Sequence, residues 1–334
     1  MTAPNECLVL LFHSVDDRDI LSLRDLGNIR PEAFDKTVAG LKEEFDILGL
    51  EDLVRCISGQ ATGPERPLAI TFDDGAKSYV TNAVPIMESH GLPSTCFLIT
   101  DCVDDRAIYW RYLYNYCVNS GRIKELEAMV AEEYGVPALQ GRIIHFTRNN
   151  FSKEATRRIM ERISENIVSE DEYREREGRL FMSFEDVESL KKNPLVTFGI
   201  HTCSHPVMKG LTDQEIKGEI SGSLDFYRTR VGDDVPMFSV PFGRLYRDYD
   251  ERTVNIALGL SIEHVFSAYG GGNAKGQALY NVRRIPVQED RLKEGVSSSI
   301  AHIRDRCVAD DYMEEEARLL SAVEGLASPQ ETKP

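Results

Sequence analysis

Five short, continuous apolar runs constrain the fold of this chain more than any other feature. Continuous rather than alternating apolarity predicts strands that are covered on both faces, which is the usual state of strands in a parallel sheet. The runs are CLVLLFH (7–13), LAITFDD (68–74), STCFLIT (94–100), VTFGIH (196–201) and MFSVPFG (237–243).

Helical patterns lie between these runs. Residues 212–232 open with capping-box spacing between Thr212 and Glu215, carry an apolar face and stop near Gly232. A second helix is expected to begin at Ser183 and to end before Pro194. Strands that alternate with helices indicate βα units, and hence an α/β fold with a parallel sheet or barrel.

Two segments differ from this pattern. Residues 103–180 are mostly helical in pattern and highly charged, which predicts a helical insertion between two core strands. Residues 309–334 read as an acidic C-terminal helix followed by a tail. The expected organisation is therefore one domain over 1–308, interrupted by the insertion at 103–180.

Charge and cysteine content bear on partners and compartment. The chain has 39 Lys and Arg against 55 Asp and Glu, a formal net charge of −16, which argues against a broad nucleic-acid or anionic-membrane surface. The apolar run near the N-terminus is too short for a signal sequence or a transmembrane segment. Seven cysteines without a CxxC pair favour the reducing cytoplasm, so a cytoplasmic location is expected.

Two adjacent acids, Asp73 and Asp74, follow the second apolar run in the sequence TFDDG. Neighbouring carboxylates at the end of a buried strand repel each other and are costly to desolvate, so a nearby cation is expected. His201 and His205, in FGIHTCSHP, follow another predicted strand, and one helical turn would place both imidazoles on the same side. Two imidazoles and one carboxylate, from Asp74 or Asp73, are a common ligand set for catalytic zinc.

Each motif alone has an ordinary explanation: DDG as a turn, and HxxxH as a chance spacing. Their joint position at the carboxyl ends of predicted strands, where α/β folds place their sites, favours a metal centre. A third segment, FSVPFG (238–243), also follows a strand and can present backbone N–H groups.

The motifs TFDDG, HTCSHP and VPFG, in that order, resemble those of the polysaccharide deacetylases, the NodB-homology or carbohydrate esterase family 4 group. The opening VLLFHSV and the sequences that flank the first two motifs agree with this resemblance, which covers roughly 5–104 and 178–290. It implies a distorted (β/α) barrel with fewer than eight strands. It also implies metal-dependent removal of an N-acetyl group from a sugar.

Carried over to this chain, the resemblance makes Asp73 the general base. Asp74, His201 and His205 become the ligands of a divalent metal, usually Zn²⁺. The backbone N–H of Phe242 would stabilise the oxyanion. An amide carbonyl needs an electrophile such as a divalent metal to polarise it. The negative charge of the tetrahedral intermediate needs a fixed hydrogen-bond donor.

The chain departs from the family pattern in two places. Many members have an arginine that orients the base where this chain has Ser239, and Arg283 or Arg284, in NVRRIPV, is expected to substitute for it. The usual motif of the general acid is missing. His302, in IAH, is one candidate, and His13 is favoured as acid or as a substrate contact, unless it only hydrogen-bonds a loop carbonyl.

Trp110 and the neighbouring tyrosines have two interpretations, sugar stacking or a core-facing helix.

The leading hypothesis is a cytoplasmic, metal-dependent deacetylase that acts on an N-acetylated sugar or a nucleotide- or lipid-linked glycan precursor in surface-polysaccharide synthesis. The alternatives are a deformylase or amidase that cleaves another C–N bond, and an inactive protein that binds metal and carbohydrate.

Overall fold

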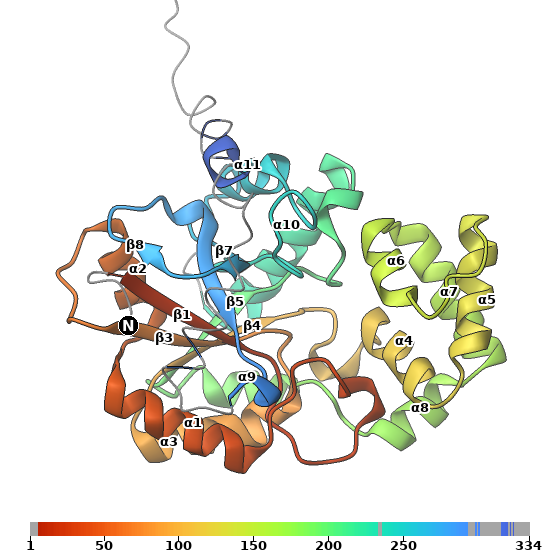
Figure 1. Cartoon of the computed structure of the whole chain (residues 1–334), viewed down its shortest axis with the longest axis horizontal. Coiled ribbons are helices and arrows are strands. Elements are labelled where there is room, and N and C mark those ends of the chain that lie inside the picture. The colour runs from red at the N-terminus through yellow and green to blue at the C-terminus, as the bar shows by residue number, and fades with distance from the viewer. Residues whose placement is uncertain are drawn as a thin grey trace, which may run out of the picture.

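The computed structural model of the chain describes residues 6–232 and 236–292, together with 298, 300, 315–319, 321 and 323. Its centre is a closed barrel of parallel strands (Figure 1). β1 pairs with β3 on one side and with β9 on the other, so the order β3-β4-β5-β6-β7-β9-β1 returns to β3. The ring consists of β1 (Glu6–Phe12), β3 (Pro67–Phe72), β4 (Ser94–Leu98), β5 (Val196–Ile200), β6 (Phe238–Ser239), β7 (Val265–Gly270) and β9 (Val282–Pro286).

Two further short strands lie outside the ring. β2 (Asp46–Ile47) runs parallel to β3, and β8 (Asn273–Ala274) runs antiparallel to β1. The ring thus has seven strands among the described residues, which confirms the distorted (β/α) barrel with fewer than eight strands. Each of the five apolar runs overlaps one strand of the ring.

Burial on both faces explains why the strands are continuously apolar. Every residue of β3 is buried. In β1, alternate side chains point to opposite faces of the sheet. Leu10 packs in one apolar cluster with Phe34 of α1 (Pro31–Glu44), whereas Val9 packs in another with Phe97 and Phe266 from other strands of the barrel.

The remaining helices next to the barrel connect successive strands or follow them. They are α2 (Leu50–Ser58), α3 (Val84–His90), α9 (Phe184–Leu190), α10 (Asp213–Arg230) and α11 (Glu251–Gly259). The predicted capping box of α10 is present, because Thr212 and Glu215 satisfy each other's backbone N–H groups. α9 begins after Ser183, as expected.

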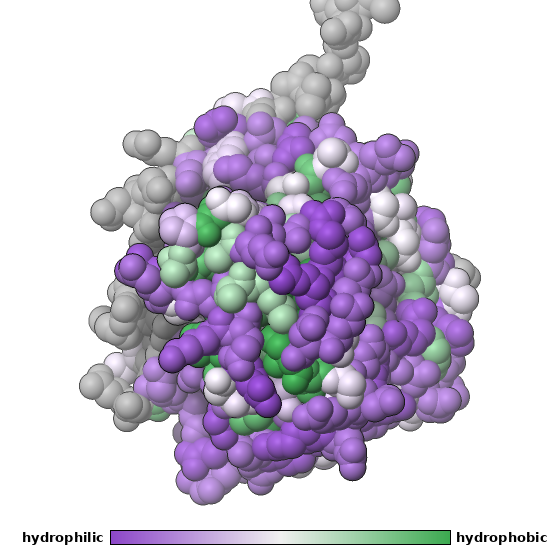
Figure 2. Space-filling model, turned by 90° about the vertical axis from the view of Figure 1, so that its right-hand side faces the viewer, coloured by the Kyte–Doolittle hydropathy of each residue, from purple (hydrophilic) through white to green (hydrophobic). Residues whose placement is uncertain are grey.

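Residues 103–180 form a group of helices at one side of the barrel (Figure 1). These are α4 (Trp110–Asn119), α5 (Ile123–Tyr134), α6 (Ile143–Asn149), α7 (Lys153–Asn166) and α8 (Glu170–Glu177). Figure 2 views the molecule from this side, where most of the surface is hydrophilic and apolar groups are small.

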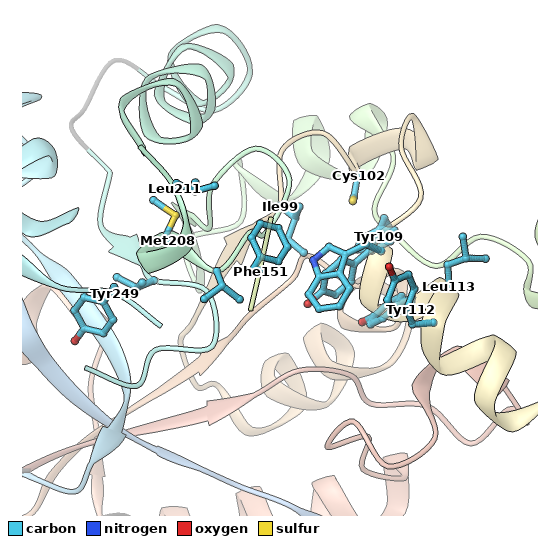
Figure 3. Packing of buried hydrophobic residues seen from close by; sticks show 14 of the residues in the cluster. Ile99, Cys102, Tyr109, Tyr112, Leu113, Phe151, Met208, Leu211 and Tyr249 are labelled. Atoms are coloured by element: carbon cyan, nitrogen blue, oxygen red, sulfur yellow. The ribbon is translucent and has the colours of Figure 1, made fainter. Parts of the chain in front are cut away.

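The helical group shares one apolar cluster with the barrel. Ile159 and Ile163 of α7 belong to the same cluster as Ile200 and Phe238 of the strands, and Figure 3 shows part of this packing. The helices are therefore built into the core and can position groups at the barrel. The boundaries assigned to the domain and its insertion stay predictions.

The C-terminal helix expected over 309–334 lies mostly outside the described residues, although 315–319 are helical. His302 also lies outside them. In the described part of the chain, no helix is both long and apolar enough to cross a membrane.

Candidate active site

The carboxyl ends of the parallel strands bring the predicted residues together. His13 follows β1, Asp73 and Asp74 follow β3, and His201 follows β5. They line a pocket of about 360 Å³. Its wall also contains His205, Phe242, Tyr109, Arg111, Tyr112 and Arg148.

The loop that carries the two histidines differs from the expected helical turn. Thr202 and His205 have φ of 67° and 57°, a left-handed conformation that interrupts a right-handed helix. The Thr202 hydroxyl accepts a hydrogen bond from the His205 backbone N–H at 3.0 Å. The expectation of a helical turn was wrong, yet the two imidazole centroids still lie 4.7 Å apart.

Left-handed backbone recurs at other motif residues of this site. Asp74 has φ of 73° and Phe242 has φ of 60°. Non-glycine residues in this conformation carry a cost of order 1–3 kcal/mol each and persist where the surrounding structure holds them. The concentration of such residues around one pocket is typical of a functional site.

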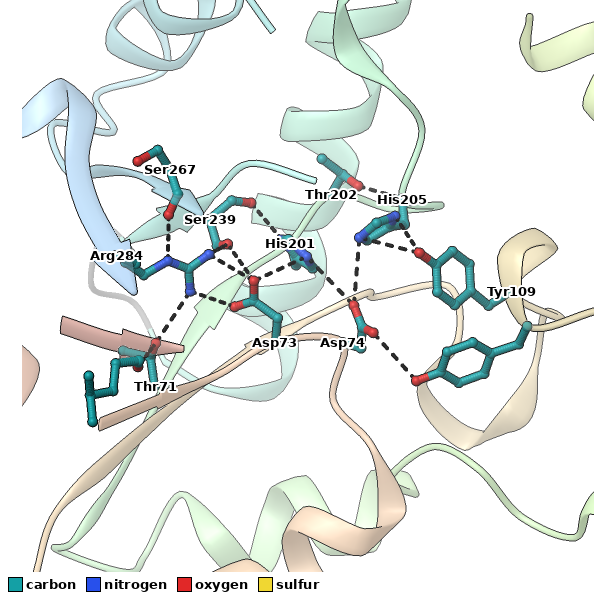
Figure 4. A network of polar contacts seen from close by, with 12 residues as sticks. Thr71, Asp73, Asp74, Tyr109, His201, Thr202, His205, Ser239, Ser267 and Arg284 are labelled. Atoms are coloured by element: carbon teal, nitrogen blue, oxygen red, sulfur yellow. Dashed lines mark hydrogen bonds and ion pairs between the residues drawn. The ribbon is translucent and has the colours of Figure 1, made fainter. Parts of the chain in front are cut away.

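Asp74, His201 and His205 form a buried cluster whose candidate ligand atoms all lie within 4.8 Å of one another (Figure 4). The Nε2 atoms of both histidines lie 3.6 Å from Oδ1 of Asp74. That oxygen is buried and has no hydrogen-bond partner in the described part of the chain. An orphaned carboxylate oxygen facing two imidazole nitrogens fits a divalent cation.

Hydrogen bonds on the far side of each ring set its orientation. Nδ1 of His201 lies 2.7 Å from the Ser239 carbonyl oxygen, to which only a protonated Nδ1 can donate. Its Nε2 therefore keeps a lone pair, as a metal ligand requires. Nδ1 of His205 lies 2.7 Å from the Tyr109 hydroxyl, which leaves its Nε2 directed at Asp74.

The charge state of Asp74 indicates the same need for a cation. Burial, and then the negative charge of Asp73, raise the pKa of Asp74 to about 7. The positive charge of Arg111 and a hydrogen bond from Tyr112, 3.4 Å from Oδ2, act in the opposite direction. A bound cation would stabilise the ionised carboxylate.

Asp73 lies in a different environment. Nη1 and Nη2 of Arg284 each donate to one of its carboxylate oxygens at 2.8 Å. The Ser239 hydroxyl donates to Oδ2 at 3.1 Å and accepts from Arg284 Nη2 at 2.6 Å. Burial alone would raise the pKa of Asp73, but the charge and hydrogen bonds of Arg284, together with the nearby His201 and His13, outweigh it and lower the pKa to about 2.

This arrangement resolves the choice between the two arginines. Arg284 is fully buried and contacts Asp73, whereas Arg283 contacts Glu316 instead. The small side chain at Ser239 bridges Asp73 and Arg284 at the position where many family members carry the arginine itself.

His13 and Phe242 border the pocket without joining the ligand cluster. Burial lowers the pKa of His13 to about 4, against the opposing charge of Asp73, so this ring is neutral near pH 7. The Phe242 ring centroid lies 4.8 Å from that of His205. The acid role of His13 and the oxyanion role of the Phe242 N–H stay predictions.

Four residues at the site were not assigned these contacts from the sequence: Tyr109, Arg111, Tyr112 and Arg148, of which the two tyrosines were considered only for sugar stacking or for the core. All four come from the helical segment at 103–180, and no periodicity relates them to a distant histidine loop. Trp110 is 4% exposed, and its Nε1 donates to the His205 carbonyl at 3.1 Å. The core interpretation is therefore confirmed for Trp110.

Comparisons with known proteins identify the family and the fold. A sequence model of the polysaccharide deacetylase family matches residues 60–265. No curated protein matches the chain. The structure is similar to that of the deacetylase PplD from Streptococcus pyogenes, solved in complex with acetate (14% identity, TM-score 0.58, covering 89% of this chain and 99% of that one).

Two further solved structures share the fold. IcaB from Ammonifex degensii is 16% identical, with a TM-score of 0.59 and coverage of 90% of this chain and 97% of that one. A de-N-acetylase from Aggregatibacter actinomycetemcomitans is 14% identical, with a TM-score of 0.58 and coverage of 89% and 99%. With its three motifs gathered in one pocket, the chain belongs to the polysaccharide deacetylase family, whose members are hydrolases of carbon–nitrogen bonds other than peptide bonds.

Proposed function

We propose that this protein is a metal-dependent hydrolase that removes the N-acetyl group from a sugar or glycan precursor during surface-polysaccharide synthesis. One observation carries the proposal: Oδ1 of Asp74 is buried without a hydrogen-bond partner among the described residues and faces Nε2 of both His201 and His205. These three residues would hold a divalent cation. Two imidazoles and a carboxylate are a usual set for catalytic zinc, so we propose Zn²⁺.

When bound, a divalent cation polarises the acetyl carbonyl and lowers the pKa of a water molecule. Asp73 supplies the proton acceptor, because it is ionised at neutral pH and lies 3.6 Å from the ligand nitrogen of His201. Arg284 and Ser239 fix both oxygens of Asp73, so the carboxylate needs no reorganisation when it accepts the proton.

The later steps fall to residues at the edge of the pocket. The Phe242 N–H would donate to the oxygen that becomes negative in the tetrahedral intermediate. An amine leaves readily only when it is protonated, and His13 is the candidate donor. Since His13 is neutral in the resting protein, the proton that Asp73 takes from water would pass to His13 before it reaches the leaving amine.

The choice of an acetylated sugar is supported by family membership and by the structural similarity to the deacetylase PplD and to the Aggregatibacter de-N-acetylase. The cytoplasmic location is also a proposal. It is supported by the cysteines, because the six described ones are free thiols, of which five are buried.

Acetate release from N-acetylhexosamines and their oligomers, measured with zinc-loaded wild type and the Asp73→Asn variant, tests the proposal. We expect turnover by wild type and a large loss in the variant. The corresponding N-formyl sugars are tested alongside. Release of formate from them, without release of acetate from the N-acetyl sugars, would indicate a deformylase. Sugar binding without turnover, unchanged by Asp73→Asn, would indicate a binding protein. Either result would overturn the proposed activity.

A further inference from the structure

A second pocket, of about 420 Å³, adjoins the candidate active site. It is lined by Arg111, Gly141, Arg142, Ile144, His145 and Arg148, from α4, α6 and the turn before α6. Arg111 and Arg148 line both pockets, so the two spaces share a wall. We call this second space the arginine pocket.

The charge of the arginine pocket is opposite to that of the whole molecule. Its lining contains three arginines and one histidine but no acidic residue. The chain has a formal net charge of −16, so a pocket wall free of acids beside an acidic ligand cluster needs a specific reason. A concentration of guanidinium groups favours an anionic ligand.

The three arginines are not equivalent. Arg148 forms an ion pair with buried Asp248, which offsets its charge and fixes its position. Arg111 has no ion pair in the described part of the chain, and its Nε is buried without a hydrogen-bond partner there. Arg142 is exposed and likewise has no ion pair among the described residues. Two cations thus remain available to a ligand.

Packing holds the Arg111 guanidinium at the boundary between the two pockets. Its central carbon lies 5.1 Å from the Phe242 ring centroid, and that of Arg148 lies 4.9 Å from the same centroid. Phe242 belongs to the third motif and also contacts His205. Arg111 is therefore placed beside the groups proposed to cleave the amide.

We infer that the arginine pocket binds a phosphate group carried by the substrate, so that the acetylated sugar in the active site is linked to a phosphate. This inference rests on the proposed deacetylase function and specifies its substrate class. Guanidinium groups bind phosphate through paired N–H donors, and Arg111 and Arg142, which have no ion pair among the described residues, both line the pocket. A sugar phosphate, a nucleoside diphosphate sugar and a lipid diphosphate sugar all present this chemistry.

Anion binding can be tested without any turnover. Inorganic phosphate and pyrophosphate are titrated by calorimetry into chelator-treated protein, in which no cation at the ligand cluster can capture the anion. We expect binding that weakens about 10- to 100-fold in Arg111→Gln and in Arg142→Gln. Arg162→Gln is the matched control, because Arg162 lies on α7, pairs with Glu132 and lines neither pocket.

Absence of phosphate and pyrophosphate binding to folded wild-type protein would overturn the inference. So would equal losses in the control and the pocket variants, or acetate binding as tight as pyrophosphate binding. These readouts stand even if no acetylated sugar is turned over, so failure of the proposed function is distinguishable from failure of the phosphate site.

Kinetics then identify the source of the phosphate. The ratio of kcat/KM for an N-acetylhexosamine 1-phosphate to that for its neutral methyl glycoside should fall about 10- to 100-fold in Arg111→Gln. Arg162→Gln should keep the wild-type ratio. Nucleoside diphosphate sugars and polyprenyl diphosphate sugars are tested as two further substrates. The phosphorylated sugar with the highest kcat/KM identifies the source of the phosphate. Equal turnover of neutral and phosphorylated sugars, unaffected by Arg111→Gln, would contradict the inference.

Discussion

Asp73 and Asp74 are neighbours in the chain but have opposite electrostatic environments. Arg284 binds both oxygens of Asp73, and the pKa of this carboxyl falls to about 2. Asp74 lacks such a partner, and burial beside Asp73 raises its pKa to about 7. One carboxylate is thus compensated by the protein itself, and the other is left for a cation.

Replacement of Asp73 tests this division of roles. Asp73→Asn keeps the size of the side chain but removes the proton acceptor, so kcat should fall about 10²- to 10⁴-fold. Acetate release at saturating substrate measures the loss. Asp171→Asn, an exposed change on α8, should retain wild-type activity. Near-normal kcat in Asp73→Asn would exclude Asp73 as the base.

His13 gives a prediction about stability at acidic pH. Its pKa is lowered to about 4 in the folded protein, whereas an unfolded histidine titrates near pH 6.5. Below pH 6.5 the unfolded chain therefore binds a proton that the folded chain does not, and stability is lost as the pH falls towards 4.

Between pH 7 and pH 5, wild type should lose about 1–2 kcal/mol more unfolding free energy than His13→Gln. Urea unfolding of both chelator-treated proteins measures this difference. Parallel pH dependence of the two proteins would show that His13 titrates normally in the folded state.

At the scale of elements, the start of α4 supports the histidine loop. Tyr109 directly precedes the helix and contacts His205 Nδ1, and Trp110 binds the carbonyl of the same residue. Tyr112, two residues further into the helix, reaches Asp74. The helical segment at 103–180 therefore orients the proposed metal ligands, which follow strands of the barrel.

Loss of the Tyr109 hydroxyl should weaken metal binding. Groups that orient a ligating histidine typically contribute 10- to 100-fold in affinity, and we expect a loss of about this size in Tyr109→Phe. Competition with a chromogenic chelator measures the change. Tyr114→Phe is the control, because Tyr114 lies buried on the same helix but its hydroxyl has no partner in the described part of the structure. Equal affinities of the two variants would contradict this role.

α10 supports the same loop from the other side. Its Glu219 accepts hydrogen bonds from the backbone N–H and the hydroxyl of Ser204, between the two histidines.

The capping box at Thr212 stabilises the start of this helix, so Thr212→Ala should lower the unfolding free energy by about 1 kcal/mol. Chemical unfolding measures the loss. Thr229→Ala, an exposed change near the other end of α10, should not be destabilising; an equal loss there would exclude the cap as the cause.

At the scale of the whole molecule, the barrel and the positions of the motifs were predictable from the sequence. Strands covered on both faces leave a continuous apolar signature, and their carboxyl ends must meet at one edge, which placed Asp73, Asp74 and His201 together. The loop from His201 to His205 was not predictable, because the left-handed conformation of Thr202 depends on tertiary contacts. The contact between Tyr109 and His205 spans 96 positions, and no local pattern encodes it.

Charge is also distributed unevenly at this scale. The acidic surface implied by a net charge of −16 is interrupted at the arginine pocket, next to the ligand cluster. Since surface electrostatics are screened by salt, any phosphate-dependent preference should weaken as ionic strength rises. Total composition excludes a broad anion-binding surface but does not reveal a local pocket built by folding.

The metal content of the purified protein shows whether Asp74, His201 and His205 bind a divalent cation. We expect about one equivalent of zinc, or of a similar divalent ion, in wild type and in Asp73→Asn. We also expect loss of this metal in Asp74→Asn and in His205→Ala, because each removes one of three ligands. Wild-type protein that remains free of metal after incubation with zinc would contradict the account.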